Sequence, residues 1–252
     1  MSKSCAIVIP VYRTTLEWNE KISLKQCAEV LNKYDIIFVH PEDLDIRNYI
    51  EYIPNARSVT FKKKFFKDIS SYSKMMMLPG FYRRFLSYDY ILIYQLDAFV
   101  FKDELEQWLM EDYDYIGAPW IDATWIKLLK EKISFIDRII YPVGNGGFSL
   151  RKTKTFFINS ILLLPVTLCW KRKWNEDFFW STFSKRLIPG FKIPSVSQAL
   201  QFAFEERPEK CLELNNNKLP FGCHAWEKYN IEFWRPYFLE CGYMFPENLN
   251  SK

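Results

Sequence analysis

Asp97 is the acidic residue whose place in the sequence most favours chemistry. It comes just after the apolar run 90–94, so we expect it at the carboxyl end of a buried strand. Open α/β sheets bind their ligands at that end, and a buried carboxylate is costly unless it is paired or coordinates a metal. A helix N-cap is the structural alternative, but Asp103 and Glu104 are better placed to cap the next helix. We therefore favour a functional role for Asp97.

His224 is one of only two histidines in the chain. A histidine among aromatic residues is more often a satisfied core residue than a ligand, but Pro220 and Gly222 indicate that this segment is a loop. Beside Asp97, a neutral imidazole would complete a site of mixed oxygen and nitrogen ligands suited to Mn²⁺ or Mg²⁺. The other histidine, His40, lies at the end of an expected strand. We expect it to be structural or to contact the metal ligands of such a site without binding the metal itself.

Glu176 and Asp177 open an apolar helical run and follow the basic cluster 171–173. Acidic residues in the first turn of a helix are favoured by the helix dipole, and for this segment alone that interpretation is the stronger one. The alternative is that one of the two carboxylates faces a cleft and acts as a general base, with neighbouring aromatic side chains raising its pKa by desolvation.

The segment 144–147 contains three of the eight glycines of the chain. Its spacing matches neither a dinucleotide-binding fingerprint nor a Walker loop. Two interpretations remain equally open: a tight turn between two strands, which Asn-Gly favours, and a close approach of the backbone to a ligand.

Composition limits the class of protein. The chain has 252 residues, 49% hydrophobic and 25% charged, which excludes disorder of the whole chain. A net charge of +4 is too small for a dedicated nucleic-acid binder, so we expect no nucleic-acid partner. The six cysteines are scattered without a CxxC pair, which indicates free thiols and a reducing cytoplasm. The N-terminus lacks the features of a signal peptide. The longest apolar stretch, residues 156–170, is too short to span a bilayer.

Strand and helix patterns alternate along the chain. We expect strands at 6–11, 34–40, 59–61, 90–94 and 113–117, a helix at 16–33, and two helical pieces within 73–86, which Pro79 and Gly80 interrupt. Beyond about residue 143 we expect more loops. This alternation predicts an α/β fold in which helices flank a mostly parallel central sheet, in one domain that spans residues 1–252.

The order of these segments is more specific than any one of them. In sequence they are Tyr94-Gln95-Leu96-Asp97, Tyr113 to Trp120, Gly144 to Arg151, Asn175 to Phe179 and Phe221 to Trp226. The chain resembles a GT-A-type glycosyltransferase, a Rossmann-like fold. It is most similar to a sparsely characterised bacterial family linked to the synthesis of surface polysaccharides, O-antigen or capsule. The resemblance covers about residues 7–226 and is most specific over 94–120.

The resemblance implies the transfer of a sugar from a nucleotide diphosphate donor, with a UDP-hexose favoured, to a glycan or lipid-linked glycan. It implies a nucleotide-sugar-binding half at about 1–120 and an acceptor-side half at about 121–252. The usual metal motif of such enzymes, Asp-x-Asp, reads Gln95-Leu96-Asp97 here. Asp97 and His224 match the positions of metal ligands, while dependence on Mn²⁺ or Mg²⁺ stays open because an amide replaces the first acid.

The resemblance also assigns roles at the site. Asp177, beside Glu176, matches the catalytic base of inverting enzymes. The residues expected to contact the donor are Pro10, Tyr12, Gln95, Asp97, Trp120, Gly146, Gly147 and Arg151. Arg151 and Lys74 are candidates to share the neutralisation of the leaving diphosphate. Trp120, Trp180 and Trp226 either stack on sugar faces or fill the core.

Two other classes of function remain as alternatives. One is a non-catalytic protein that binds carbohydrate or nucleotide on a degenerate transferase fold, which the incomplete metal motif favours. The other is a metal-dependent phosphodiesterase or nuclease, which the scattered acids and the basic pI suggest; it fits poorly because the sequence shows neither a paired-acid metal motif nor a His-rich cluster. We expect a cytoplasmic protein, with peripheral association at the inner face of the membrane as a further possibility. The lysines at 62–64 and 67 around an aromatic pair suit a solvated face, a phosphate contact or an anionic membrane surface alike.

Overall fold

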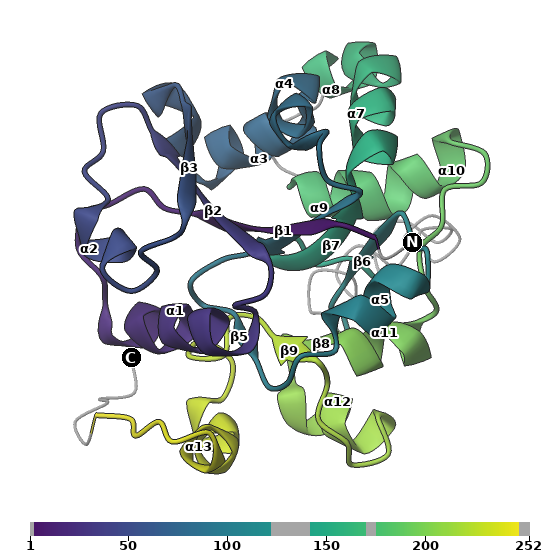
Figure 1. Cartoon of the computed structure of the whole chain (residues 1–252). Coiled ribbons are helices and arrows are strands. Elements are labelled where there is room, and N and C mark those ends of the chain that lie inside the picture. Colours follow the sequence, from purple (N-terminus) through teal and green to yellow (C-terminus); the bar gives the residue numbers. More distant parts are fainter. Residues whose placement is uncertain (1–2, 122–141, 170–174, 247–252) are drawn as a thin grey trace.

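A six-stranded sheet forms the centre of the protein. The computed structural model describes residues 3–121, 142–169 and 175–246 (Figure 1). The order across the sheet is β3 (Arg57–Phe61), β2 (Asp35–Pro41), β1 (Cys5–Pro10), β4 (Tyr90–Tyr94), β7 (Phe148–Lys152) and β6 (Tyr115–Gly117). The first four strands are parallel, and β7 is antiparallel to both of its neighbours. The predicted α/β fold with a mostly parallel sheet is confirmed.

Apolar runs form these strands because both faces of the sheet are covered. In β1, the strand between β2 and β4, Ile7 and Ile9 enter one buried cluster, and Ala6 and Val8 enter another on the opposite face. The strand predicted at 90–94 matches β4 residue for residue, and those predicted at 6–11 and 34–40 are each shifted by one residue.

Helices cover the two faces as separate layers (Figure 1). On one face lie α1 (Trp18–Val30) and α5 (Leu105–Met110), and on the other lie α3 (Ile69–Met77), α4 (Pro79–Tyr82) and α7 (Thr153–Leu162). The break predicted between two helical pieces falls at Leu78. It arises because Pro79 disfavours helical geometry in the residue before it and starts α4 as the first helical residue.

The remaining elements are short. They are α2 (Arg47–Ile50), the 3₁₀ turns η1 (Lys63–Phe66) and η2 (Arg83–Phe85), α8 (Leu164–Cys169), α9 (Glu176–Phe178), the π-helical turn η4 (Phe179–Ser184), α10 (Lys185–Leu187), α11 (Val196–Phe202), α12 (Pro208–Leu214) and α13 (Ile231–Glu240). We expected more loops beyond residue 143 than before it. Instead, that part of the chain forms β7 and a series of short helices, whose few turns give a weak periodic signal.

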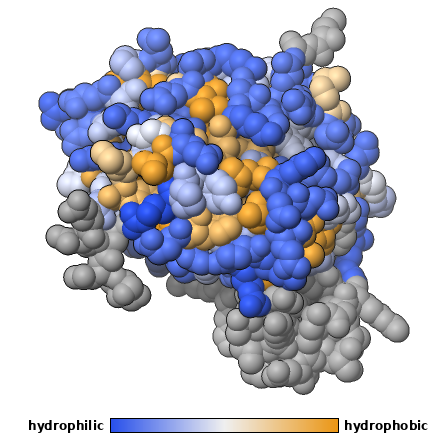
Figure 2. Space-filling model, turned by 90° about the horizontal axis from the view of Figure 1, so that it is seen from below, coloured by the Kyte–Doolittle hydropathy of each residue, from blue (hydrophilic) through white to orange (hydrophobic). Residues whose placement is uncertain are grey.

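A second, small sheet joins the C-terminal part to the centre. Its order is β5 (Phe99–Val100), β9 (Gly222–Cys223) and β8 (Ala203–Phe204). Because β9 pairs with β5, the loop that carries His224 is drawn to the segment that carries Asp97. The end of the molecule with α12 and α13 faces the viewer in Figure 2, where apolar patches are bordered by hydrophilic side chains.

The expected caps of α5 differ from the structure. Glu104 precedes the helix, but its side chain accepts no hydrogen bond from the first turn. Asp103 forms an ion pair with Lys33 instead, with an O–N distance of 2.6 Å. Capping of α5 by Asp103 therefore competes with its ion pair to Lys33, which comes from a distant part of the sequence. The sequence around residue 103 does not show that partner.

None of the helices in the described ranges is both long and apolar enough to cross a bilayer.

Candidate active site

A cleft of about 580 Å³ opens where β1 and β4 end. Its volume is typical of sites for small molecules. The predicted site residues that line it are Pro10, Tyr12, Gln95, Asp97, Gly146, Gly147, Glu176, Asp177 and His224. These residues come from both halves of the chain, so folding alone gathers segments that are more than 200 positions apart.

Asp97 and His224 meet on one wall of this cleft. The Nε2 atom of His224 lies 3.1 Å from Asp97 Oδ1 and 3.2 Å from Gln95 Oε1. On the other side of the ring, Nδ1 lies 3.0 Å from Glu205 Oε1. The imidazole is thereby fixed between two carboxylates, and Asp97 is not a helix cap.

Burial and charge act in opposite directions on this pair. Burial lowers the pKa of His224, but Asp97 and Glu205 raise it more, to about 10. Burial raises the pKa of Asp97, but His224 lowers it more, so that it lies below its ordinary value. The arrangement therefore favours an imidazolium at neutral pH, which places one positive charge in a wall rich in carboxylates.

The same atoms fit a divalent cation. Apart from its ion pair with His224, the buried Oδ1 atom of Asp97 has no hydrogen-bond partner among the described residues. Carboxylate, imidazole and amide oxygen are all ligands that Mn²⁺ and Mg²⁺ accept. The separations of 3.1 and 3.2 Å from His224 Nε2 are close to the ~3 Å edge of an octahedron with bonds of about 2.1 Å. The described residues contain no group of three His, Cys, Asp or Glu side chains arranged to hold a metal, so Gln95 is the third protein ligand available.

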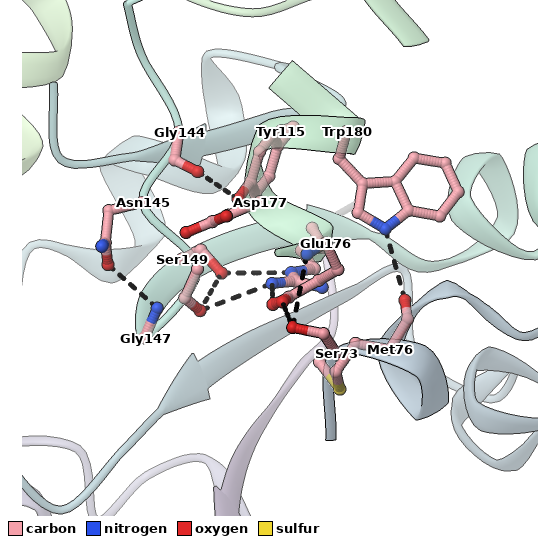
Figure 3. A network of polar contacts seen from close by, with 12 residues as sticks. Ser73, Met76, Tyr115, Gly144, Asn145, Gly147, Ser149, Glu176, Asp177 and Trp180 are labelled. Atoms are coloured by element: carbon pink, nitrogen blue, oxygen red, sulfur yellow. Dashed lines mark hydrogen bonds and ion pairs between the residues drawn. The ribbon is translucent and has the colours of Figure 1, made fainter. Parts of the chain in front are cut away.

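Glu176 is held on the opposite wall by a buried network (Figure 3). Ser73 Oγ donates to Glu176 Oε2 at 2.8 Å, and Arg151 Nη2 donates to Oε1 at 3.2 Å. Arg151 also donates to the hydroxyls of Tyr82 and Ser149, at 3.0 and 3.1 Å. Its guanidinium is completely buried. Both oxygens of Glu176 are thus occupied, which leaves this carboxylate poorly placed to accept a proton from a ligand.

Asp177 has a different environment, although it is the next residue. Its carboxylate lines the cleft and has no ion-pair partner in the described part of the chain; Oδ1 accepts a hydrogen bond from the backbone N–H of Phe178 at 2.6 Å. Burial and the nearby charge of Glu176 raise its pKa to about 7. A carboxylate with such a pKa is matched to proton abstraction near neutral pH.

The pKa of Asp177 predicts a pH dependence. A general base works only when it is deprotonated, so kcat/KM is expected to rise with pH and level off above about 7. A steady-state profile between pH 5 and 9 checks this, and Glu206→Gln, which alters a partly buried carboxyl outside the cleft, should show the same profile. A rate that stays flat across pH 7 would contradict the role of Asp177.

The glycine-rich turn separates the two walls. Asn145 Oδ1 accepts from Gly147 N–H at 3.0 Å, which closes a turn immediately before β7. A Cβ at Gly146 would lie 2.7 Å from Glu176 Oε1, and one at Gly147 would collide with the ring of His224. The segment is therefore a tight turn, and its backbone lies close to the side chains of Glu176 and His224; a close approach to a ligand stays a prediction.

Gly147→Ala is expected to weaken donor binding by at least tenfold, because the imidazole must move away from Asp97 to admit a methyl group. Overpacking of this kind also costs about 1–3 kcal/mol of stability. Gly80→Ala is the matched control, since a Cβ there meets nothing within 4 Å, and it should preserve affinity. Calorimetric titration of both variants checks the prediction, and equal affinities would contradict it.

Some predicted residues do not line the cleft. Arg151 is buried and pairs with Glu176, and Trp120 is also buried; neither is among the residues that line the cleft. Trp180 and Trp226 fill the core, where their Nε1 atoms donate to Met76 O and Ser23 Oγ. Lys74 is exposed outside the cleft.

The structure also places His40 and the basic residues around 62–67. His40 is buried away from the cleft, with Nδ1 2.8 Å from the carbonyl of Pro41, which agrees with a structural role. Among the basic residues around 62–67, Lys67 lines the cleft.

The sequence interpretation missed Glu205 and Tyr72. Glu205 directly follows β8, but this strand has only two residues and was not predicted, so the rule applied to Asp97, that a polar residue after a strand is a site candidate, did not reach it. Tyr72 lies on α3 and lines the cleft together with Gln95. No spacing in the sequence connects these two residues.

Comparison with known proteins places the chain in a family. A family model described as "Protein of unknown function (DUF5672)" matches residues 55–224. The chain belongs to this family. No curated protein sequence is significantly similar to it.

Solved structures share the fold at low sequence identity. A glycosyltransferase involved in glycosylation of the major capsid of PBCV-1 has a TM-score of 0.53 and 10% identity, over 94% of this chain and 99% of that one. The galactosyltransferase LgtC, solved with donor and acceptor sugar analogs, has 0.53 and 12%, over 96% and 98%. The bifunctional enzyme WbbM has 0.54 and 12%, over 91% of this chain, which spans only 47% of WbbM. The GT-A fold predicted from the sequence is confirmed.

Proposed function

We propose that this protein is a glycosyltransferase that moves a sugar from a nucleotide diphosphate to a hydroxyl group of an acceptor. The observation that carries the proposal is the division of the cleft. The pair Asp97 and His224 lies beside Gly147, and the carboxylate of Asp177 lies beside Gly146. One wall can therefore receive the negative charge of a leaving diphosphate, while the other accepts a proton.

The chemistry is a single displacement with inversion. Asp177 takes the proton of the acceptor hydroxyl as its oxygen bonds to the anomeric carbon of the donor. The bond from that carbon to the phosphate oxygen breaks, and the nucleoside diphosphate leaves with the electron pair. His224, held by Asp97 and Glu205, offers positive charge to the leaving group while its imidazole is protonated. A divalent cation held by Asp97, Gln95 and the deprotonated Nε2 of His224 would supply positive charge in place of that proton when bound.

Asp97→Asn is expected to weaken Mn²⁺-dependent binding of UDP by at least tenfold, because the site loses its one negatively charged ligand. Gln95→Asp, which restores a second acid, should strengthen it. Thermal shift and calorimetry with UDP, with and without Mn²⁺, measure both effects. If Mn²⁺ does not change the affinity for UDP in the wild type or in either variant, His224 alone would neutralise the charge of the diphosphate.

The finer parts of the proposal concern the substrates and their place in the cell. We favour a UDP-hexose donor and a glycan or lipid-linked glycan acceptor in the synthesis of a bacterial surface polysaccharide, O-antigen or capsule. Such a reaction belongs in the cytoplasm, at the inner face of the membrane. Residues from about 1–120 would bind the nucleotide sugar, and those from about 121–252 the acceptor.

A donor screen tests the proposal. The purified chain is mixed with a panel of nucleotide sugars, with and without Mn²⁺, and nucleotide release and thermal shift are followed together. Release of one nucleotide above the rate without protein supports a transferase and names its donor. A thermal shift that persists without release, even after crude glycan acceptors are added, supports the binding-protein alternative, which the amide at Gln95 favours. The absence of both nucleotide release and thermal shift with every donor in the panel would count against the proposal.

A further inference from the structure

The distribution of polar and apolar side chains on α7 and α8 is the reverse of that on an ordinary surface helix. Along residues 156–167, the inward positions carry Asn159, Ser160 and Thr167 besides Phe156 and Leu163, and all five are buried. The outward positions carry large aliphatic side chains. They are Ile158, Ile161, Leu162, Val166 and Leu168, which together we call the α7–α8 face.

The exposure of these side chains is large. Leu162 is 67% exposed and Leu168 is 63% exposed, and all five lie within eleven consecutive residues. On α7, Ile158, Ile161 and Leu162 follow the spacing i, i+3, i+4, which places them on one side of that helix, and Val166 and Leu168 follow on α8. Isolated exposed aliphatic residues are common, but a contiguous apolar face on a monomer usually marks an interaction site.

Basic side chains border this face, although the exposed Asp89 lies at the start of α7, where its carbonyl accepts a hydrogen bond from Thr153 N–H. Residues 153–169 contain no Asp or Glu, and their one charged side chain is the exposed Lys154. Helix α7 packs against α4, and η2, which follows α4 directly, adds the exposed Arg83 and Arg84. Aliphatic side chains bordered by cations are the composition of segments that bind anionic membrane surfaces.

We propose that the α7–α8 face docks on a bilayer rich in anionic lipid, with its five aliphatic side chains inserted at the level of the headgroups. Insertion is shallow, because no helix in the described ranges could cross the bilayer. Lys154, Arg83 and Arg84 contact lipid phosphates at the rim. This surface is separate from the lysines at 62–67, of which Lys67 lines the cleft.

The docked face lies close to the active site along the chain. Only five residues separate Cys169, the last residue of α8, from Asn175, which lines the cleft. A fully extended chain of this length spans about 20 Å, which sets the upper limit on the distance between them. If the proposed function is correct, docking would hold the cleft near a lipid-linked acceptor. The docking itself does not depend on that function.

Flotation of the purified full chain with vesicles tests the proposal. Vesicles of equal parts phosphatidylcholine and phosphatidylglycerol should carry the protein, and pure phosphatidylcholine should carry much less. Ile161→Glu/Leu162→Glu is expected to lower the partition coefficient by at least ~10-fold, because it replaces two inserted aliphatic side chains by anions. The matched control is Leu239→Glu/Met244→Glu, which alters side chains 58% and 81% exposed at the opposite end of the molecule, and it should float like the wild type.

A second variant protects the test against misfolding. Leu162→Ser/Leu168→Ser adds no charge, and it should keep the circular dichroism spectrum and Tm of the wild type while losing most of its binding to vesicles. Wild-type protein that fails to float, or Glu variants that float equally well, would overturn the proposal. So would a dimer of the wild type that the Glu variant dissociates without any effect on flotation, since a second copy of the chain would then cover the face.

Discussion

Asp177→Asn is expected to lower the turnover number by about 10²–10⁴-fold, the usual contribution of a general base. Asparagine has nearly the same shape as aspartate but cannot accept the proton of the acceptor hydroxyl. Because a base acts in the transition state, the affinity for the donor should stay almost unchanged. Single-turnover rates and calorimetric donor affinities, measured with the donor that the screen identifies, check the two halves of this prediction.

The same substitution has an expected effect on stability, which separates loss of a base from loss of structure. Burial raises the pKa of Asp177 from its ordinary value of 3.8 to about 7. Folding is therefore opposed by ionisation of this carboxyl as pH rises from about 4 to 7, and the penalty is complete above 7. Asp177→Asn removes the penalty, so the variant should gain stability relative to the wild type at pH 8 and gain none at pH 4.

The control for Asp177→Asn is Glu206→Gln. Burial also raises the pKa of Glu206, but this residue does not line the cleft, so its substitution should leave turnover intact. Full turnover in Asp177→Asn would show that another group removes the proton, and Glu176 would be the first to test. A loss of turnover together with a loss of Tm at pH 8 would indicate structural damage instead.

The strands were predictable because their signal is local. Buried β-branched runs such as residues 6–10 and 90–94 can be recognised from a few consecutive residues. The position of Asp97 beyond the carboxyl end of the second run was predicted from the same local pattern. The reversed direction of β7 was not predictable. A five-residue run has the same composition in either direction, and its orientation is set by pairing with β4, about 60 residues earlier.

The role of Arg151 illustrates what the sequence does not contain. The resemblance to GT-A glycosyltransferases implied a contact between Arg151 and the donor. In β7, however, alternation puts Arg151 on the same face as Ser149, where the guanidinium meets Glu176 of α9. The third partner of this network, Ser73, precedes Glu176 by 103 positions. Ion pairs between elements so far apart depend on register and packing, for which a single sequence has no periodic signature.

Arg151→Met is expected to reduce the free energy of unfolding by about 3–5 kcal/mol, because it leaves the buried carboxylate of Glu176 without its counter-charge. Urea denaturation at pH 7 measures the loss. Arg57→Met is the matched control: Arg57 pairs with Asp35 at 2.6 Å, but both side chains are more than half exposed. An exposed pair of this kind contributes about 0–1 kcal/mol, so the control should unfold close to the wild type.

A double variant distinguishes an unpaired charge from a simple loss of packing. Arg151→Met/Glu176→Met removes both charges and keeps similar volumes, and it should recover most of the stability lost in Arg151→Met. The recovered protein should still turn over more slowly than the wild type. Ser73 and Arg151 hold Glu176 in place, and Glu176 both precedes Asp177 and raises its pKa. Without that charge, the ascending limb of the pH profile should move below pH 7. A double variant as unstable as Arg151→Met, with an unshifted profile, would show that the network fills space and does not tune the base.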